Sequence, residues 1–180
     1  MADKSGTEKT STASTRSIRI DKITINIGCG GDENAIERAK KLLAMLTSRK
    51  KSIVTLSKRR STFGVAKGKP VGVKMTLRDK EAVEFLKLAL GGVDNKLKKS
   101  QFDSEGNFSF GVKEYIELPG IKYSHDIGMM GFDVAVSLER AGFRIGRRRI
   151  QKIRIPSKHK IKTEESIEWA KKNFGVDIIG

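Results

Sequence analysis

The chain is short of the residues from which disulfides, metal sites and membrane spans are built. Its 180 residues include one cysteine, Cys29, and two histidines, His125 and His159. A single cysteine excludes an internal disulfide, and so few ligands near one another in sequence give no zinc constellation. No run of about 18 apolar residues and no signal peptide are present. We therefore expect a soluble, cytoplasmic protein with no metal, no cofactor and no membrane contact.

Catalytic constellations are also missing. Ser124, His125 and Asp126 are adjacent, and consecutive residues cannot adopt the geometry that a Ser-His-Asp triad requires. Cys29 has no histidine near it in sequence. We expect no active site, and we predict that the protein is not an enzyme.

Acidic residues are scarce in two segments. The chain has 37 Lys and Arg against 21 Asp and Glu, a formal net charge of +16. Residues 49–80 hold 11 basic residues and one acid, and residues 140–162 hold ten basic residues and no acid. Such concentrations favour a polyanionic partner. Neither segment has the amphipathic helical pattern of a membrane-surface helix, so a nucleic acid is the better candidate than an anionic membrane.

Hydrophobic periodicity predicts an α+β protein. Residues 1–17 are rich in Ser, Thr and Lys and are predicted to form a disordered tail. Strands are predicted near 23–28, 52–57, 71–78, 108–112 and 132–138, and helices over 32–47, over 79–90 with Asp79 as N-cap, and over 164–174 with Thr163 as cap. The order of elements favours a single mostly antiparallel sheet with helices packed on one face and a polar, RNA-facing opposite face, all within one domain of residues 18–180.

The polar side chains of the first three predicted strands include no acid. They are Thr24, Asn26, Thr55, Ser57, Lys74, Thr76 and Arg78. Hydroxyl, amide and cationic groups can donate hydrogen bonds to phosphate oxygens and to ribose hydroxyls. This composition favours an RNA contact over an ordinary solvated strand face.

The glycine-rich stretch after the first strand does not match a nucleotide-binding turn. Gly28 and Gly30 fit a G-x-G-x-x-G pattern, but Glu33 occupies the third glycine position. Asp32 and Glu33 would place carboxylates at the start of the following helix, where they repel a phosphate. A nucleotide-dependent enzyme is therefore disfavoured. The glycines are better explained by a sharp turn that lets the backbone approach a partner closely.

Several motifs together resemble the ribosomal large-subunit protein five family, in its archaeal form. They are "ITINIGCGG", "KRRSTFGVAKGKPVGVKMTLR", "FSFGVKEYIELPGI" and "RAGFRIGRRRIQKIRIPSKHKI", and the resemblance covers about residues 18–180. It implies a structural subunit of the central protuberance that binds 5S rRNA, contacts 23S rRNA and neighbouring ribosomal proteins, and approaches the peptidyl-site tRNA through a basic hairpin loop.

The resemblance and the polar strand face together give three sets of candidate residues. The 5S rRNA set is Thr24, Asn26, Gly28, Gly30, Thr55, Ser57, Lys74, Thr76 and Arg78. The tRNA-contacting loop is Lys58, Arg59, Arg60, Ser61, Thr62, Phe63, Gly64 and Lys67. Other rRNA contacts are assigned to Arg144, Arg147, Arg148, Arg149 and Lys152. The alternative is a free RNA-binding regulatory protein that acts outside the ribosome.

Overall fold

The structure is a computed structural model that describes residues 16–47, 51–58 and 65–180. The tail predicted over residues 1–17 lies outside the described residues except for its last two. The strands are β1 (Ile18–Gly28), β2 (Ile53–Leu56), β3 (Pro70–Leu77), β4 (Lys96–Lys98), β5 (Phe108–Val112), β6 (Phe132–Arg140) and β7 (Asp177–Ile179). The α-helices are α1 (Glu33–Leu46), α2 (Asp79–Gly91) and α3 (Thr163–Phe174).

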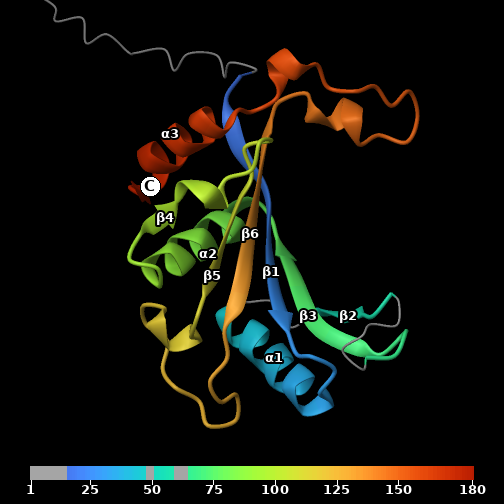
Figure 1. Cartoon of the computed structure of the whole chain (residues 1–180), viewed down its shortest axis with the longest axis vertical. Coiled ribbons are helices and arrows are strands. Elements are labelled where there is room, and N and C mark those ends of the chain that lie inside the picture. Colours follow the sequence, from blue (N-terminus) through green and yellow to red (C-terminus); the bar gives the residue numbers. More distant parts are fainter. Residues whose placement is uncertain (1–15, 48–50, 59–64) are drawn as a thin grey trace, which may run out of the picture.

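A five-stranded antiparallel sheet forms the centre of the molecule (Figure 1), in the order β2-β3-β1-β6-β5. This confirms the predicted α+β class and its mostly antiparallel sheet. A small parallel pair, β4 with β7, was not predicted. These three-residue strands are too short to show a period in the sequence, and Leu97 becomes buried only because the two chain segments meet.

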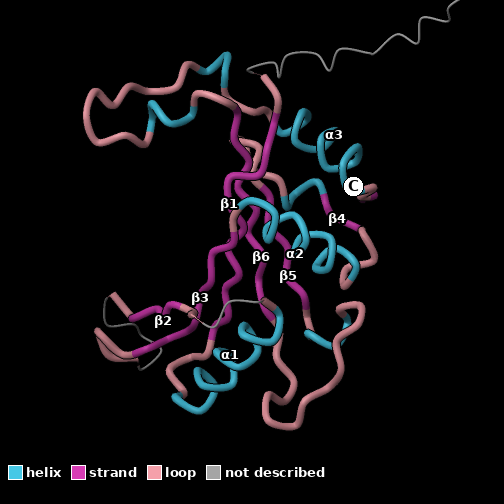
Figure 2. The backbone as a smooth tube through the Cα atoms, turned by 180° about the vertical axis from the view of Figure 1, so that it is seen from behind, coloured by secondary structure: helices cyan, strands magenta, loops and turns pink. Residues whose placement is uncertain are grey.

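One face of the central sheet carries the hydrophobic core. Alternate residues of β1 and β3, such as Ile25 and Met75, lie opposite each other and are almost fully buried. Helices α1 and α2 cover this face, and Leu42 of α1 and Leu86 of α2 have no exposed surface. Figure 2 shows both helices on the same side of the strands. Burial of these apolar side chains is the main force that holds the layers together.

The helix starts differ partly from the predictions. Asp32 caps α1 as expected, because its carboxylate accepts a hydrogen bond from the Asn34 backbone N–H at 3.0 Å. The predicted N-cap role of Asp79 is wrong by one residue. Arg78 is the N-cap in extended conformation, and Asp79 begins α2 with a positive φ of 55°. The backbone is thus extended through Arg78, and it turns from strand to helix at the single residue Asp79.

Helix α3 begins at the residue that was expected to cap it. Lys162 is the N-cap, and its backbone N–H donates a hydrogen bond to Glu165 at 3.0 Å. The helix ends at Phe174, and Gly175 follows with φ of 64°, as a helix-terminating glycine does. Trp169 of α3 packs against the core and donates a hydrogen bond to the Ile18 carbonyl.

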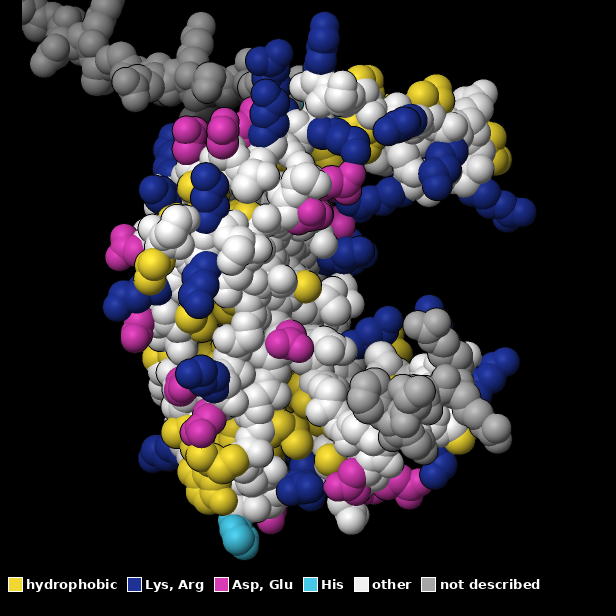
Figure 3. All heavy atoms as spheres, in the orientation of Figure 1, with side chains coloured by type: hydrophobic (Ala, Val, Ile, Leu, Met, Phe, Trp, Pro, Cys, Tyr) yellow, Lys and Arg dark blue, Asp and Glu magenta, His cyan; other side chains and the backbone are white. Residues whose placement is uncertain are grey.

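Two projections extend from the sheet on the side away from α2 and α3 (Figures 1 and 2). One is the end of the β2–β3 hairpin. The other is a loop of residues 141–160, called the arm below, which contains only two short 3-10 turns at Phe143–Gly146 and Ser157–His159. The molecule is hollowed between the projections, and Lys and Arg side chains gather on both sides of this hollow (Figure 3).

Candidate RNA-binding surface

The face of the central sheet opposite the helices, called the open face below, carries polar residues in rows across the strands. Thr24 of β1 lies opposite Thr76 of β3 and Ala135 of β6. In the next row, Asn26 lies opposite Lys74 and Asp133. The strand register therefore brings four predicted residues, Thr24, Asn26, Lys74 and Thr76, onto one surface, where Asn26 and Lys74 are exposed.

Glycines form the lower end of the open face. Thr55 of β2 lies opposite Gly72 of β3, which in turn lies opposite Gly28 of β1. A Cβ atom at Gly72 would overlap the carbonyl oxygen of Ile27, so this position needs glycine for strand pairing. Gly28 has open space where a Cβ would stand, so the protein itself does not require a glycine there. The predicted residue Ser57 lies just beyond β2, where its N–H donates to the Lys69 carbonyl at 2.8 Å.

The glycine-rich turn after β1 reverses the chain toward α1. Gly30 and Gly31 have positive φ angles of 62° and 96°, which side-chain-bearing residues rarely adopt. Cys29 between strand and turn donates its N–H to Val71, and burial raises the pKa of its thiol. The Asp32 carboxylate occupies the helix N-terminus. These contacts confirm the sharp turn and oppose a phosphate at this helix end.

Arg78 lies at the other end of the open face and is held in an ion pair. Its Nη1 is 3.1 Å from Oδ1 of Asp21, and Nη1 of Arg147 is 2.9 Å from the same oxygen. Burial by itself would raise the pKa of Asp21, but the hydrogen bond and charge of Arg147, together with the charge of Arg78, hold that pKa below its ordinary value. Two residues predicted to contact different RNA segments therefore meet at one carboxylate.

The open face as a whole is not free of acids. The acid-free pattern holds for the predicted side chains of β1, β2 and β3, but β6 contributes Asp133, which is exposed beside Asn26. The alternating pattern of Phe132, Val134 and Val136 already indicated that Asp133 faces away from the core. Asp21 was missed because the strand was predicted to start at residue 23, whereas β1 begins at Ile18.

Most of the predicted tRNA loop lies outside the described residues. These are Arg59, Arg60, Ser61, Thr62, Phe63 and Gly64. The flanking residues Lys58 and Lys67 are exposed, and the Gly68 N–H donates to the Ser57 carbonyl at 2.9 Å. The hairpin that carries the loop is therefore in place, at the projecting end of β2 and β3.

The arm carries the third predicted set. Arg144, Arg149 and Lys152 are exposed and form no ion pair within the described part of the chain. Arg148 donates from Nε to the Gln151 carbonyl at 2.7 Å, which closes the tip of the arm. These four cations have no matching acids among the described residues, as in a phosphate-binding segment, whereas Arg147 and Lys160 of the arm are paired with acids.

Two absences hold for residues 16–47, 51–58 and 65–180. No helix in them is long and apolar enough to cross a membrane. No group of three or more His, Cys, Asp or Glu side chains in them could hold a metal ion.

Comparison with known proteins identifies the family. A model of the C-terminus of the ribosomal large-subunit protein five family matches residues 70–178. The large ribosomal subunit protein uL5 of Sulfurisphaera tokodaii is 45% identical over 166 residues, which are 91% of this chain and 93% of that protein. The uL5 protein of Picrophilus torridus is 41% identical over 173 residues, 96% of this chain and 98% of that protein. The chain that carries these two projections and the open face therefore belongs to the ribosomal large-subunit protein five family.

Proposed function

We propose that the chain is a structural, non-catalytic component of the large ribosomal subunit and that it binds 5S rRNA on the open face. The observation that carries this proposal is the open face itself, which none of the described helices covers and which lies between two basic projections (Figures 1 and 3). The names of the similar archaeal proteins support the ribosomal role.

The chemistry of the open face fits RNA. Thr24, Thr76 and Asn26 offer hydroxyl and amide groups that can bind ribose 2′-hydroxyls and base edges in the shallow groove of an RNA helix. Lys74 supplies a charge that binds phosphate and releases counterions. Gly28 and Gly72 have no side chains, so an RNA backbone can come close to the strands at this end of the open face.

The projections extend the proposal to further RNA partners. Arg144, Arg148, Arg149 and Lys152 of the arm are assigned to 23S rRNA, because these four cations have no acidic partners among the described residues. The basic hairpin loop is assigned to the peptidyl-site tRNA. Surfaces that RNA does not cover are available to neighbouring large-subunit proteins.

The test is a filter-binding titration of the purified protein with 5S rRNA and with a tRNA, each at two salt concentrations. Tighter binding to 5S rRNA that persists at the higher salt supports the proposal, because generic charge attraction is screened while shape recognition is not. Equal binding to both RNAs, lost together as salt rises, contradicts it.

A matched pair of variants locates the surface. Lys74→Ala removes one charge from the open face, and Lys40→Ala removes one from the exposed side of α1. We expect only Lys74→Ala to weaken 5S rRNA binding. Equal losses in both variants would contradict the assignment to the open face.

Cosedimentation with ribosomal large subunits in a sucrose gradient separates the ribosomal role from that of a free RNA-binding regulator. A subunit protein migrates with the large particles, whereas a free regulator stays near the top of the gradient.

A further inference from the structure

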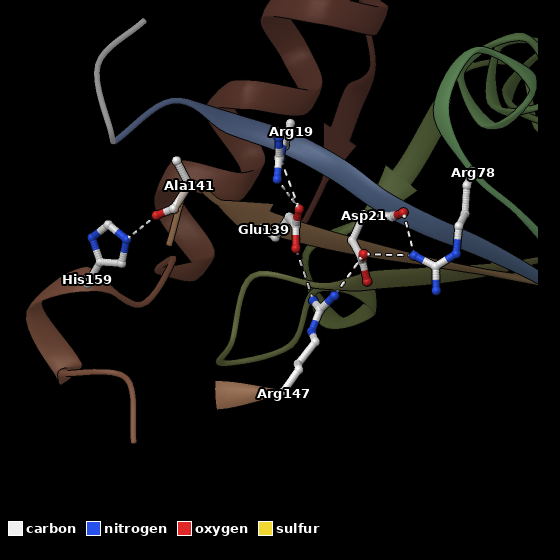
Figure 4. A network of polar contacts seen from close by, with 7 residues as sticks. All are labelled: Arg19, Asp21, Arg78, Glu139, Ala141, Arg147 and His159. Carbon is white, nitrogen blue, oxygen red and sulfur yellow. Dashed lines mark hydrogen bonds and ion pairs between the residues drawn. The ribbon is translucent and has the colours of Figure 1, made fainter. Parts of the chain in front are cut away.

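A buried carboxylate joins the open face to the arm. The Asp21 side chain is 5% exposed, and its Oδ1 accepts hydrogen bonds from Nη1 of Arg78 at 3.1 Å and Nη1 of Arg147 at 2.9 Å. Figure 4 shows Asp21 between the two guanidinium groups. Arg78 follows β3 and Arg147 lies in the arm, so one acid ties two parts of the molecule that lie far apart in the sequence.

A second acid fixes the same arm residue. Nη2 of Arg147 is 3.2 Å from Oε2 of Glu139, whose other oxygen is 2.6 Å from Arg19. Arg147 therefore bridges carboxylates from β1 and β6. This double contact sets the direction of its guanidinium plane, because the fork of N–H donors is rigid.

The arm has few other ties to the body of the protein. Ile150 and Ile153 are 77% and 59% exposed, so the outer arm adds little to the core. At its base, Phe143 packs against the core, Lys160 forms an ion pair with Glu105 at 2.6 Å, and Arg140 donates to the His159 carbonyl at 3.5 Å. Among the described residues, Arg147 supplies both ion pairs that join the arm to strands of the central sheet.

Both arginines keep donors free for a ligand. The side chains of Arg78 and Arg147 are 53% and 51% exposed. Nε and Nη2 of Arg78 and Nε of Arg147 have no partner among the described residues. Guanidinium groups bind phosphate oxygens through several N–H donors at once, and two held side by side can bind the same phosphate group.

We propose that Asp21 is a positioning residue that holds Arg78 and Arg147 as a pair, and that this pair binds a backbone phosphate of RNA where the sheet meets the arm. The proposal rests on the RNA-binding function above.

Net charge and the proposal predict opposite results when Asp21 is neutralised. Removal of one negative charge should strengthen the binding of a basic protein to RNA. If Asp21 positions the arginines, Asp21→Asn should instead weaken binding. The matched control is Asp126→Asn, an exposed aspartate in the loop between β5 and β6 with no ion pair in the described part of the chain.

The experiment is filter binding of 5S rRNA over a series of salt concentrations. We expect Asp21→Asn to weaken binding by about tenfold, as loss of a charged hydrogen bond does. The slope of log affinity against log salt should fall by about 0.7 to 0.9, the value for one phosphate. A partly unfolded sample would lower the active fraction without changing this slope. Binding by Asp21→Asn that equals or exceeds that of the wild type, like Asp126→Asn, overturns the proposal.

A second pair of variants keeps the net charge constant. Arg147→Lys retains the charge but loses the fork that bridges Asp21 and Glu139, whereas Arg149→Lys makes the same change at an exposed arm residue. We expect only Arg147→Lys to weaken binding, and Asp21→Asn should add little to the loss in Arg147→Ala. Equal affinities of the two lysine variants, or full additivity in the double variant, would contradict the proposal.

The two proposals fail in different ways. Equal binding of wild-type protein to 5S rRNA and tRNA overturns the 5S rRNA function. In that case the affinity of the Asp21 variants for tRNA is measured instead. The direction in which that affinity changes still decides the role of Asp21.

Discussion

Asp133 of β6 lies directly opposite Asn26 of β1, which places a carboxylate in the middle of an otherwise cationic and polar surface. Asp133 is exposed, and its Oδ1 lies over Gly111 of β5, 3.3 Å from where a Cβ of that residue would stand. A carboxylate in this position repels phosphates and accepts hydrogen bonds only from donors such as base amino groups and ribose hydroxyls. It therefore disfavours a phosphate beside β6, on the opposite side of Asn26 from Lys74.

Asp133→Asn should make the surface less selective. We expect the affinity for tRNA to rise by about two- to threefold at low salt, because one repulsive charge is lost, and the gain to shrink as salt screens it. The affinity for 5S rRNA should rise less. Filter binding with both RNAs measures the change, and an equal gain for the two would show that Asp133 contributes charge but no selectivity.

Gly72 and Gly28 should differ in what an added methyl group does. Gly72→Ala should lower the free energy of unfolding by about 1–3 kcal/mol, because its Cβ meets the Ile27 carbonyl and forces β1 and β3 apart. Gly28→Ala should change that free energy by less than about 0.5 kcal/mol, since its Cβ has open space.

The RNA affinities of these variants complete the comparison. Gly28→Ala should weaken 5S rRNA binding although the fold is intact, because the methyl group would stand where we propose that the RNA backbone approaches. Denaturant unfolding and filter binding are measured on the same samples. Unchanged RNA affinity in Gly28→Ala would show that the RNA backbone does not come close to the protein at Gly28.

The contact between β6 and α3 should depend on pH. Glu165 accepts hydrogen bonds from the Lys162 N–H and, at 2.7 Å, from Arg140, and these lower its pKa from the ordinary 4.5. A carboxylate with a lowered pKa stabilises the fold above its unfolded-state pKa, and this contribution is lost as the pH falls through the folded value.

Glu165→Gln should therefore lower the free energy of unfolding by about 1 kcal/mol at pH 7 and flatten its decline below about pH 4.5. The control is Glu164→Gln, which changes an exposed residue in the same helical turn without an ion pair in the described part of the chain. Unfolding curves from pH 3 to 7 measure the difference. Parallel curves for wild type and Glu165→Gln would show that the Arg140 contact adds no pH-dependent stability.

The basic hairpin loop should act separately from the open face. The double variant Arg59→Ala and Arg60→Ala should leave 5S rRNA affinity nearly unchanged and impair tRNA positioning in reconstituted ribosomes. The described residues that flank the loop, Lys58 and Lys67, lie outside β2 and β3, so we expect the loop to act apart from the open face. Loss of 5S rRNA binding in this variant would contradict the division between the two surfaces.

Local patterns were enough to predict most of the secondary structure and the polar residues that β1 and β3 contribute to the open face. The alternation of Ile23, Ile25 and Ile27 fixes which side of β1 is buried, because successive strand residues point to opposite faces. The polar character of Thr24, Asn26, Lys74 and Thr76 follows from the same period. The helix cap at Asp32 and the stop at Gly175 are local backbone preferences and could also be predicted from the sequence.

Tertiary structure decided what depends on which strands are neighbours. Asp133 joins the open face only because β6 pairs with β1, and Leu97 becomes buried only when β4 pairs with β7. The contact between Asp21 and Arg147 spans 126 positions in the sequence. Composition and local periodicity are enough to specify a basic α+β chain with a polar strand face. Only the fold determined that one buried carboxylate aligns cations from the sheet and the arm, because ion pairing depends on distance in space.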